Sequence, residues 1–456
     1  MDQDKYFIYI RKIQKSIEIF REENIPIFTT IQLKQQTYQQ IVGALTVNID
    51  GQELTMQQAN VLLQDTDRKK REHVWHKMNE ARLNHRDSLD KLFSELIQLR
   101  HQVATNAGFD NFRDYMFAAM GRFDYAVQDC IDFHDAVAQE VVPVVYKLAE
   151  ERRTKLQLDS LKPWDMAVDP DGLPPLRPFE NGEELVDKTI QAFNRIHPYV
   201  GQCVQTMKSH HLFDVESRIG KAPGGYNYPL AESGAPFIFM NAAGTLRDLT
   251  TMVHEGGHAV HTFISADLEL TEFKNLPSEV AELASMSMEL FSMHTWDLFF
   301  SDKNSLARAK RIQLEDAIST LPWVATIDKF QHWIYTHPQH SVQEREKAWI
   351  DIYEEFGNGY VNWNQEENAR AALWQKQLHL FEVPFYYIEY GFAQLGAIAL
   401  WKNYSFAPDD TIKKYLNALK LGYTKSIPEI YLAAGVKFDF SRQNIRNLTT
   451  FIAQNL

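Results

Sequence analysis

The chain has 456 residues, of which 45% are apolar, so it is long enough to bury a substantial core. Its formal charge of -13 argues against nucleic acid or an anionic membrane as its main partner. No apolar run could span a bilayer, and the opening MDQDKYFIYIRKI lacks a signal-peptide pattern, so we expect a cytoplasmic location. Cys130 and Cys203 are too few for a disulfide framework or a thiolate zinc site.

The first third of the chain indicates helices with one short β element. The stretch ALTVNIDGQELT predicts a hairpin, because Asp50-Gly51 lies between alternating apolar residues. Residues 65–107 contain neither Gly nor Pro and carry many charges, which predicts one long helix or a helical hairpin. A second helical stretch covers 126–158.

Prolines and turn residues crowd the segment KPWDMAVDPDGLPPLRPF. We therefore divide the chain into a helical N-terminal part at 1–161, a connection at 162–179, and a C-terminal part at 180–456. Both parts are expected to form one functional unit. The helices after Asn304 carry apolar stripes with charged backs and indicate packing only.

Two extended runs around a Ser-Gly turn occupy GGYNYPLAESGAPFIFMN, residues 224–241. They predict a small sheet directly before the motif described next. We expect the strand containing Phe237, Ile238 and Phe239 to be an edge strand that could pair with an extended ligand.

The sequence TTMVHEGGHAVHTFISA contains an HExxH motif on a predicted helix. His254 and His258 are four residues apart, so both imidazoles project from one helix face and can bind one zinc ion. Glu255 is directed toward the open coordination position, where it can accept a proton from water. Gly256 and Gly257 are unfavourable inside a helix, so we expect a second helix to approach closely there.

A catalytic zinc site needs a third protein ligand. His261 lies roughly 10 Å along the helix from His254, beyond the reach of a shared ion, so it is expected to pack or to support the site. The residues after His258 exclude the metzincin pattern. In the helix SEVAELASMSMELFSMH we choose Glu282, because small residues flank it; Glu279 suits the helix terminus, and Glu289 could anchor a ligand histidine or form a plain salt bridge.

The sequence resembles the oligoendopeptidase F and thimet-oligopeptidase-like zinc peptidases over most of its length, and it looks closest to the oligoendopeptidase F branch. The resemblance rests on ENIPIF, KAPGGYNYPLAESGAPFIFMNAAGTLRDLTTMVHEGGHAVH, PSEVAELASMSMEL and HLFEVPFYYIEYGFAQLGA. It implies a mainly α, two-lobed body around a deep channel, with a small β-sheet beside the zinc helix. It also implies one zinc per chain, held by His254, His258 and Glu282.

In similar enzymes a His and tyrosines from a late helix stabilise the transition state, and the matching residues here are His379, Tyr386, Tyr387 and Tyr390. Tyr390 is our first choice. Tyr387 and Tyr390 share a helix face, so one phenol could reach the oxyanion and the other the peptide backbone. The alternative is an aromatic core stripe.

The predicted function is zinc-dependent endopeptidase cleavage of short oligopeptides, with Glu255 as general base. Two alternatives stay open: an exopeptidase of the same class, and a non-catalytic zinc-containing scaffold that binds peptides. The expected partners are short peptides, with neither nucleic acid nor membrane, and the sequence does not indicate an oligomeric state. Relatives usually carry a further helical segment before MDQDKYFIYIRKIQKSIEIF, so we expect a short member or a missing beginning.

Overall fold

A computed structural model describes residues 5–218, 221, 224–230, 232–357 and 359–456, which form two compact units. The chain crosses from one unit to the other several times. One crossing, between Pro175 and Leu176, lies inside the predicted connection at 162–179. The other three crossings lie within helices α1 (Phe7–Ile19), α14 (Lys303–Thr336) and α18 (Tyr387–Phe406). Unit 1 comprises Met1–Ile13, Leu176–Thr320 and Glu389–Leu456, and unit 2 comprises Gln14–Pro175 and Leu321–Ile388.

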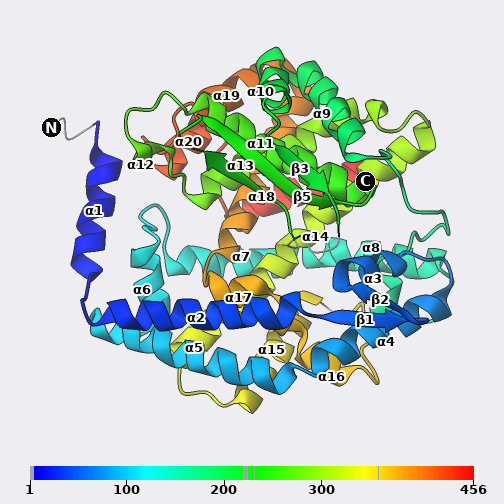
Figure 1. The fold of residues 1–456 in the computed structure, drawn as a ribbon, viewed down its shortest axis with the longest axis horizontal. Helices are drawn as coiled ribbons and strands as arrows, with labels where there is room; N and C mark the ends of the chain where they lie inside the picture. The colour runs from blue at the N-terminus through cyan, green and yellow to red at the C-terminus, as the bar shows by residue number, and fades with distance from the viewer. Residues whose placement is uncertain (1–4, 219–220, 222–223, 231, 358) are drawn as a thin grey trace. The chain divides into compact units, whose positions relative to one another are not determined.

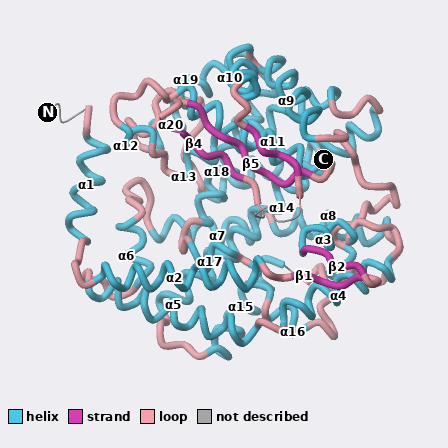
Figure 2. Tube along the Cα trace, in the orientation of Figure 1, coloured by secondary structure: helices cyan, strands magenta, loops and turns pink. Residues whose placement is uncertain are grey.

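Unit 1 packs helices around a small sheet, which confirms the predicted mainly α class (Figures 1 and 2). Two of its helices begin at polar caps: Asn181 accepts from the Glu184 N–H, and Thr245 with Asp248 forms a capping box. The helices that lie wholly in unit 1 are α9 (Gly182–Ile196), α10 (Pro198–Ser209), α11 (Leu246–Ile264), α12 (Thr271–Lys274), α13 (Ser278–Ser292), η2 (Met293–Leu298), α19 (Pro408–Leu419), α20 (Ile427–Ala433) and α21 (Arg442–Asn455).

The predicted sheet beside the motif helix is present, but the expected edge strand is wrong. The strands β3 (Phe213–Glu216), β4 (Tyr226–Leu230) and β5 (Ala235–Ala242) are ordered β3-β5-β4. The strand containing Phe237, Ile238 and Phe239 is therefore central, since β3 pairs with it in parallel and β4 in antiparallel. The two edge strands are β3 and β4 instead.

The two glycines of the motif are explained by close contacts of α11. A Cβ at Gly257 would lie 2.7 Å from the Ser285 Cα and 3.0 Å from the Ala284 oxygen, both on α13. A Cβ at Gly256 would lie 2.7 Å from the ring of Phe193 on α9. The predicted close approach of a second helix is thus confirmed at Gly257, and an aromatic ring accounts for Gly256.

Unit 2 contains the predicted hairpin and a set of helices. Asp50 and Gly51 form its turn with φ of 53° and 87°, between β1 (Thr46–Ile49) and β2 (Gln52–Thr55). The helical stretch at 65–107 forms two helices that break at Asn84 and His85. The helices that lie wholly in unit 2 are α2 (Asn24–Gly43), α3 (Met56–Leu62), α4 (Arg68–Leu83), α5 (Arg86–Asn106), α6 (Phe112–Ala119), α7 (Val127–Glu140), α8 (Val142–Lys155), η1 (Pro163–Asp165), α15 (Val342–Gly357), α16 (Glu367–Ala371), η3 (Leu373–Lys376) and α17 (Leu378–Glu382).

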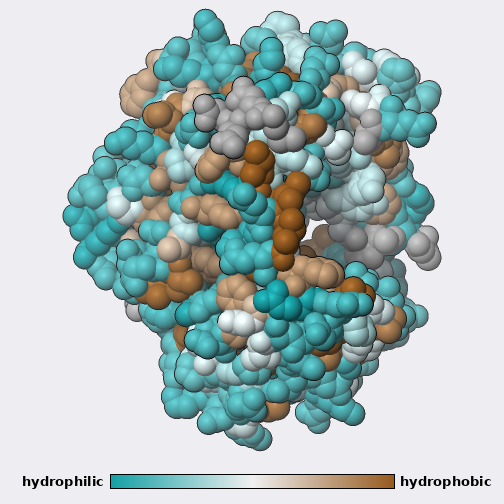
Figure 3. Space-filling model, turned by 90° about the vertical axis from the view of Figure 1, so that its left-hand side faces the viewer, coloured by the Kyte–Doolittle hydropathy of each residue, from teal (hydrophilic) through white to brown (hydrophobic). Residues whose placement is uncertain are grey.

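Helix α1 leaves large apolar side chains exposed. Phe7 is 57% exposed and Ile17 71% exposed, and apolar side chains are visible on the face in Figure 3, the side on which α1 lies. Isolated apolar side chains are common at protein surfaces, so this feature alone identifies no partner. Among the described residues, no helix combines the length and the apolar character that a membrane span requires.

Candidate metal centre

Three side chains from two helices of unit 1 converge on one point. His254 and His258 project from the same face of α11, and their ring centroids are 4.9 Å apart. Glu282 projects from α13, and its Oε2 lies 3.3 Å from the His254 Nε2 and 3.6 Å from the His258 Nε2. The structure thus brings together the three residues that the sequence predicts as zinc ligands, which we call the zinc-site triad.

The separations within the zinc-site triad fit a tetrahedral ion. Ligands at the usual zinc distance of about 2.0–2.1 Å occupy corners of a tetrahedron whose edges are about 3.3–3.4 Å long. The two nitrogen-to-oxygen separations lie within a few tenths of an ångström of that edge. The two imidazole side chains are about one-fifth exposed, so this group is not sealed from solvent.

Further hydrogen bonds orient these three side chains. The His254 Nδ1 lies 2.6 Å from the Glu289 Oε1, and because a carboxylate only accepts, this nitrogen is the donor. The Gln313 Nε2, from α14, donates to the other oxygen of Glu289 at 2.8 Å. The Ser285 hydroxyl donates to the Glu282 Oε2 at 2.9 Å. Glu289 thus has the supporting contact that the sequence left open.

The electrostatics of the centre favour a positive charge. Burial lowers the pKa of His254, but the hydrogen bonds and charges of Glu282 and Glu289 outweigh burial and raise that pKa well above its ordinary value. A centre that stabilises a proton there also stabilises a cation. Burial lowers the pKa of His258 to about 4, which keeps this imidazole neutral and able to bind metal.

Glu255 is buried beside the zinc-site triad, with only 7% of its surface exposed. Burial raises the pKa of its carboxyl group to about 7. The Asn227 side chain on β4 donates to the Glu255 backbone oxygen at 3.3 Å, which links the edge strand to the motif helix. A carboxylate with this proton affinity is suited to accept and return a proton near neutral pH.

The remaining candidates from the motif region lie elsewhere. His261 is buried on α11, as expected for a packing role. Glu279 is also buried, and its backbone oxygen accepts from the Tyr431 hydroxyl at 2.8 Å. Neither residue belongs to the group of ligand atoms around the zinc-site triad.

The predicted histidine and tyrosines near the end of the chain are divided between the two units. His379, Tyr386 and Tyr387 belong to unit 2, whereas Tyr390 on α18 belongs to unit 1. The rings of His379 and Tyr387 meet edge to face at 4.8 Å, and the Gln377 side chain contacts the His379 Nδ1 at 2.7 Å. The structure therefore groups His379 with Tyr387.

A strained backbone position precedes these tyrosines. Phe385 is fully buried and has a φ of 67°, which is costly for a bulky residue. The Gln331 Oε1 accepts from the Phe385 N–H at 2.6 Å, and Arg122 donates to its backbone oxygen. Neither Arg122 nor Gln331 belongs to a local sequence motif, so the sequence alone did not indicate these contacts.

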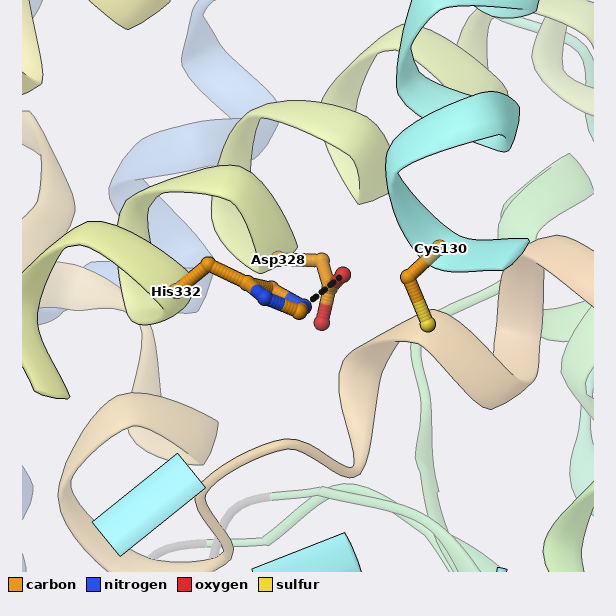
Figure 4. Close-up of side chains that lie close together, drawn as sticks. All are labelled: Cys130, Asp328 and His332. Carbon is orange, nitrogen blue, oxygen red and sulfur yellow. Dashed lines mark ion pairs between the residues drawn. The ribbon is translucent and has the colours of Figure 1, made fainter. Parts of the chain in front are cut away.

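Unit 2 contains a second group of ligand-type side chains, which we call the buried Asp328 cluster: Cys130, His134, Asp328 and His332. Ligand atoms of Cys130, Asp328 and His332 lie within 4.8 Å of one another (Figure 4). The His134 Nε2 and the His332 Nε2 lie 2.9 Å and 3.1 Å from the same Asp328 oxygen. These are hydrogen-bond distances, shorter than the edge of a zinc tetrahedron. We interpret the cluster as a buried polar network.

The comparisons with known proteins agree with one another. A family model described as Peptidase family M3 matches residues 61–450. The chain is 24% identical to an oligoendopeptidase F homolog of Lactococcus lactis subsp. lactis, over 67% of this chain and 50% of the relative. It is 21% identical to an oligoendopeptidase F homolog of Borreliella burgdorferi, over 93% of this chain and 72% of the relative. A solved structure of PZ peptidase A with inhibitor 2 superposes with a TM-score of 0.94 at 26% identity, over 99% of this chain and 80% of that chain.

Proposed function

Because this chain belongs to peptidase family M3, we propose that it is a zinc metalloendopeptidase that cleaves short oligopeptides. The zinc ligands in this proposal are His254, His258 and Glu282. The observation that carries it is the spacing of their ligand atoms, which fits a tetrahedral ion with one open position beside a buried carboxylate. The chain spans half the length of the Lactococcus relative, so activity, substrates and partners are all part of the proposal.

Each side chain has a defined task in peptide hydrolysis. Zinc bound by the triad supplies Lewis acidity, which polarises a carbonyl and makes water more acidic. Glu255 accepts a proton from the attacking water as the new C–O bond forms, and passes it to the departing amine as the C–N bond breaks. Burial beside the triad gives Glu255 the proton affinity for both transfers.

The substrate is proposed to bind as an added strand on β4. This strand is one of the two edge strands of the sheet, and its residue Asn227 contacts the backbone of Glu255. Tyr226 and Tyr228 are 49% and 61% exposed, so their rings are available to substrate side chains. Recognition through backbone hydrogen bonds predicts a broad side-chain preference.

The late residues enter as stabilisers of the transition state. We assign Tyr390 to the developing oxyanion, because a phenol donates well to negative charge, and Tyr387 to the peptide backbone. His379 contacts the ring of Tyr387 and is assigned to the same group. These three assignments rest on the resemblance to related enzymes.

The test combines zinc analysis with peptide digestion. The purified chain is mixed with peptides of graded length and with a folded protein, and the products are identified by mass spectrometry. We expect internal cleavage of short peptides only. Release of single residues or dipeptides from one end would indicate an exopeptidase. A chain that binds zinc without cutting any peptide would refute the proposal.

A further inference from the structure

The hydrogen bond from Gln313 to Glu289 is not needed by any step of the proposed chemistry. Gln313 is 4% exposed and comes from α14, a different helix from those that carry the zinc-site triad. Its Nε2 is 2.8 Å from the Glu289 Oε2. A buried side chain amide aimed at a carboxylate that already supports His254 requires an explanation.

The contacts form a directed chain of hydrogen bonds. Glu289 only accepts, so the Gln313 amide nitrogen donates to one of its oxygens and the His254 Nδ1–H donates to the other. A proton on Nδ1 leaves the lone pair of a neutral imidazole on Nε2, the nitrogen that faces Glu282. Glu289 thus selects the tautomer of His254 that can bind metal.

The carboxylate can perform this task only if it is itself held in place. The Ser292 hydroxyl donates to the Glu289 backbone oxygen at 2.9 Å, a contact that does not hold the carboxylate. Among the side-chain contacts of the described residues, the Gln313 amide is the one that fixes the second carboxylate oxygen. Without it, rotation of the carboxylate would loosen its bond to His254.

We propose that Gln313 is a positioning residue for the metal centre, which acts on His254 through Glu289. This inference rests on the proposed zinc site and deepens it. Loss of a group that supports a metal-binding histidine typically weakens metal affinity about 10- to 100-fold. Gln313 acts one bond further out, so we expect the Gln313→Leu variant to bind zinc about tenfold more weakly, near the lower end of that range.

The experiment measures zinc affinity of the whole chain by competition with a chromophoric chelator. Wild type, Gln313→Leu and Gln331→Leu are compared, together with cobalt(II) absorption spectra that report ligand geometry. Gln331 is a matched control, since it is a buried glutamine of the same helix that bonds to Phe385. We expect a weaker affinity and an altered cobalt spectrum for Gln313→Leu, and wild-type values for Gln331→Leu.

If Gln313→Leu folds poorly, variants that exchange the amide and the carboxylate between positions 313 and 289 test the same contact. Gln313→Glu places two carboxylates against each other and should weaken zinc binding strongly. Adding Glu289→Gln restores a donor and an acceptor in the reversed order, so the double variant should regain affinity relative to Gln313→Glu. Unchanged affinity in Gln313→Leu, or no recovery in the double variant, would overturn the inference. Absence of zinc binding by wild type would instead refute the zinc site itself.

Discussion

The zinc-site triad and the buried Asp328 cluster each combine two histidines with a carboxylate, but they differ in spacing and in exposure. In the triad the nitrogen-to-oxygen separations are 3.3 and 3.6 Å, and the imidazoles are partly exposed. In the Asp328 cluster the corresponding separations are 2.9 and 3.1 Å, and Asp328 is fully buried. The two groups therefore differ by a few tenths of an ångström, which is the difference between the edge of a zinc tetrahedron and a hydrogen-bond distance.

Their electrostatic roles differ in the same way. Burial raises the pKa of Asp328, but the two imidazoles outweigh burial and hold that pKa below its ordinary value. The carboxylate is thus stabilised by its own neighbours. In the triad a buried base, Glu255, lies close by with a raised pKa, and no comparable base accompanies Asp328 among the shifted groups of the described residues. We therefore expect the triad with Glu255 to serve catalysis and the Asp328 cluster to serve stability.

The largest expected effect is the loss of peptidase activity when the buried base beside the triad is replaced. Glu255→Gln should lower peptidase activity by about 100- to 10,000-fold, because it removes the general base, while zinc binding persists. Peptide cleavage is measured together with zinc content by mass spectrometry. Turnover close to that of wild type in a zinc-loaded Glu255→Gln protein would remove Glu255 from the mechanism.

The zinc content of variants tests whether the triad binds metal and the Asp328 cluster does not. We expect one zinc per chain in wild type, and a loss of affinity in His258→Ala that exceeds the roughly 10- to 100-fold effect of a supporting residue. Cys130→Ala, in the Asp328 cluster, should keep the full zinc content. Two metal ions per chain, one of them lost with Cys130, would show that the second cluster is also a metal site.

For the free energy of unfolding, we expect a substitution in the Asp328 cluster to have a larger effect than one in the triad. Asp328→Asn removes the charge that two buried imidazoles surround, and breaking a buried pair costs about 3–5 kcal/mol. In metal-free protein, Glu282→Gln should cost less, since functional groups are often kept at the expense of stability. Urea unfolding of both variants makes the comparison. An equal or larger loss for Glu282→Gln would contradict the structural role given to Asp328.

The smallest expected effect is a pH dependence. Only the carboxylate form of Glu255 can accept a proton, so kcat/KM should fall about tenfold per pH unit below its pKa. Burial raises that pKa to about 7, and a nearby metal cation favours the charged carboxylate and lowers it again. The acidic limb should therefore lie below pH 7. A limb well above pH 7 would indicate a different ionising group.

Local patterns predicted the triad better than its surroundings. The spacing of His254 and His258 is set by one helical turn. The small residues around Glu282 indicated that two helices pack closely, and α11 and α13 do so at Gly257. Gln313 could not be predicted, because its contact with Glu289 depends on how α14 packs. The edge strand was wrong for a similar reason: β3 is a short strand without a clear pattern, yet it pairs along β5. The return of residues 321–388 to unit 2 also left no local signal.

The interleaving of the two units along the chain limits how this protein can be rebuilt by recombination. Unit 1 is assembled from three separate stretches, and three of the four crossings lie inside continuous helices. Helix α14 alone carries Gln313 in one unit and Asp328 and His332 in the other. A single crossover with a relative would therefore leave unit 1 with segments from both parents, and exchange of a whole unit would need crossovers inside α1, α14 and α18.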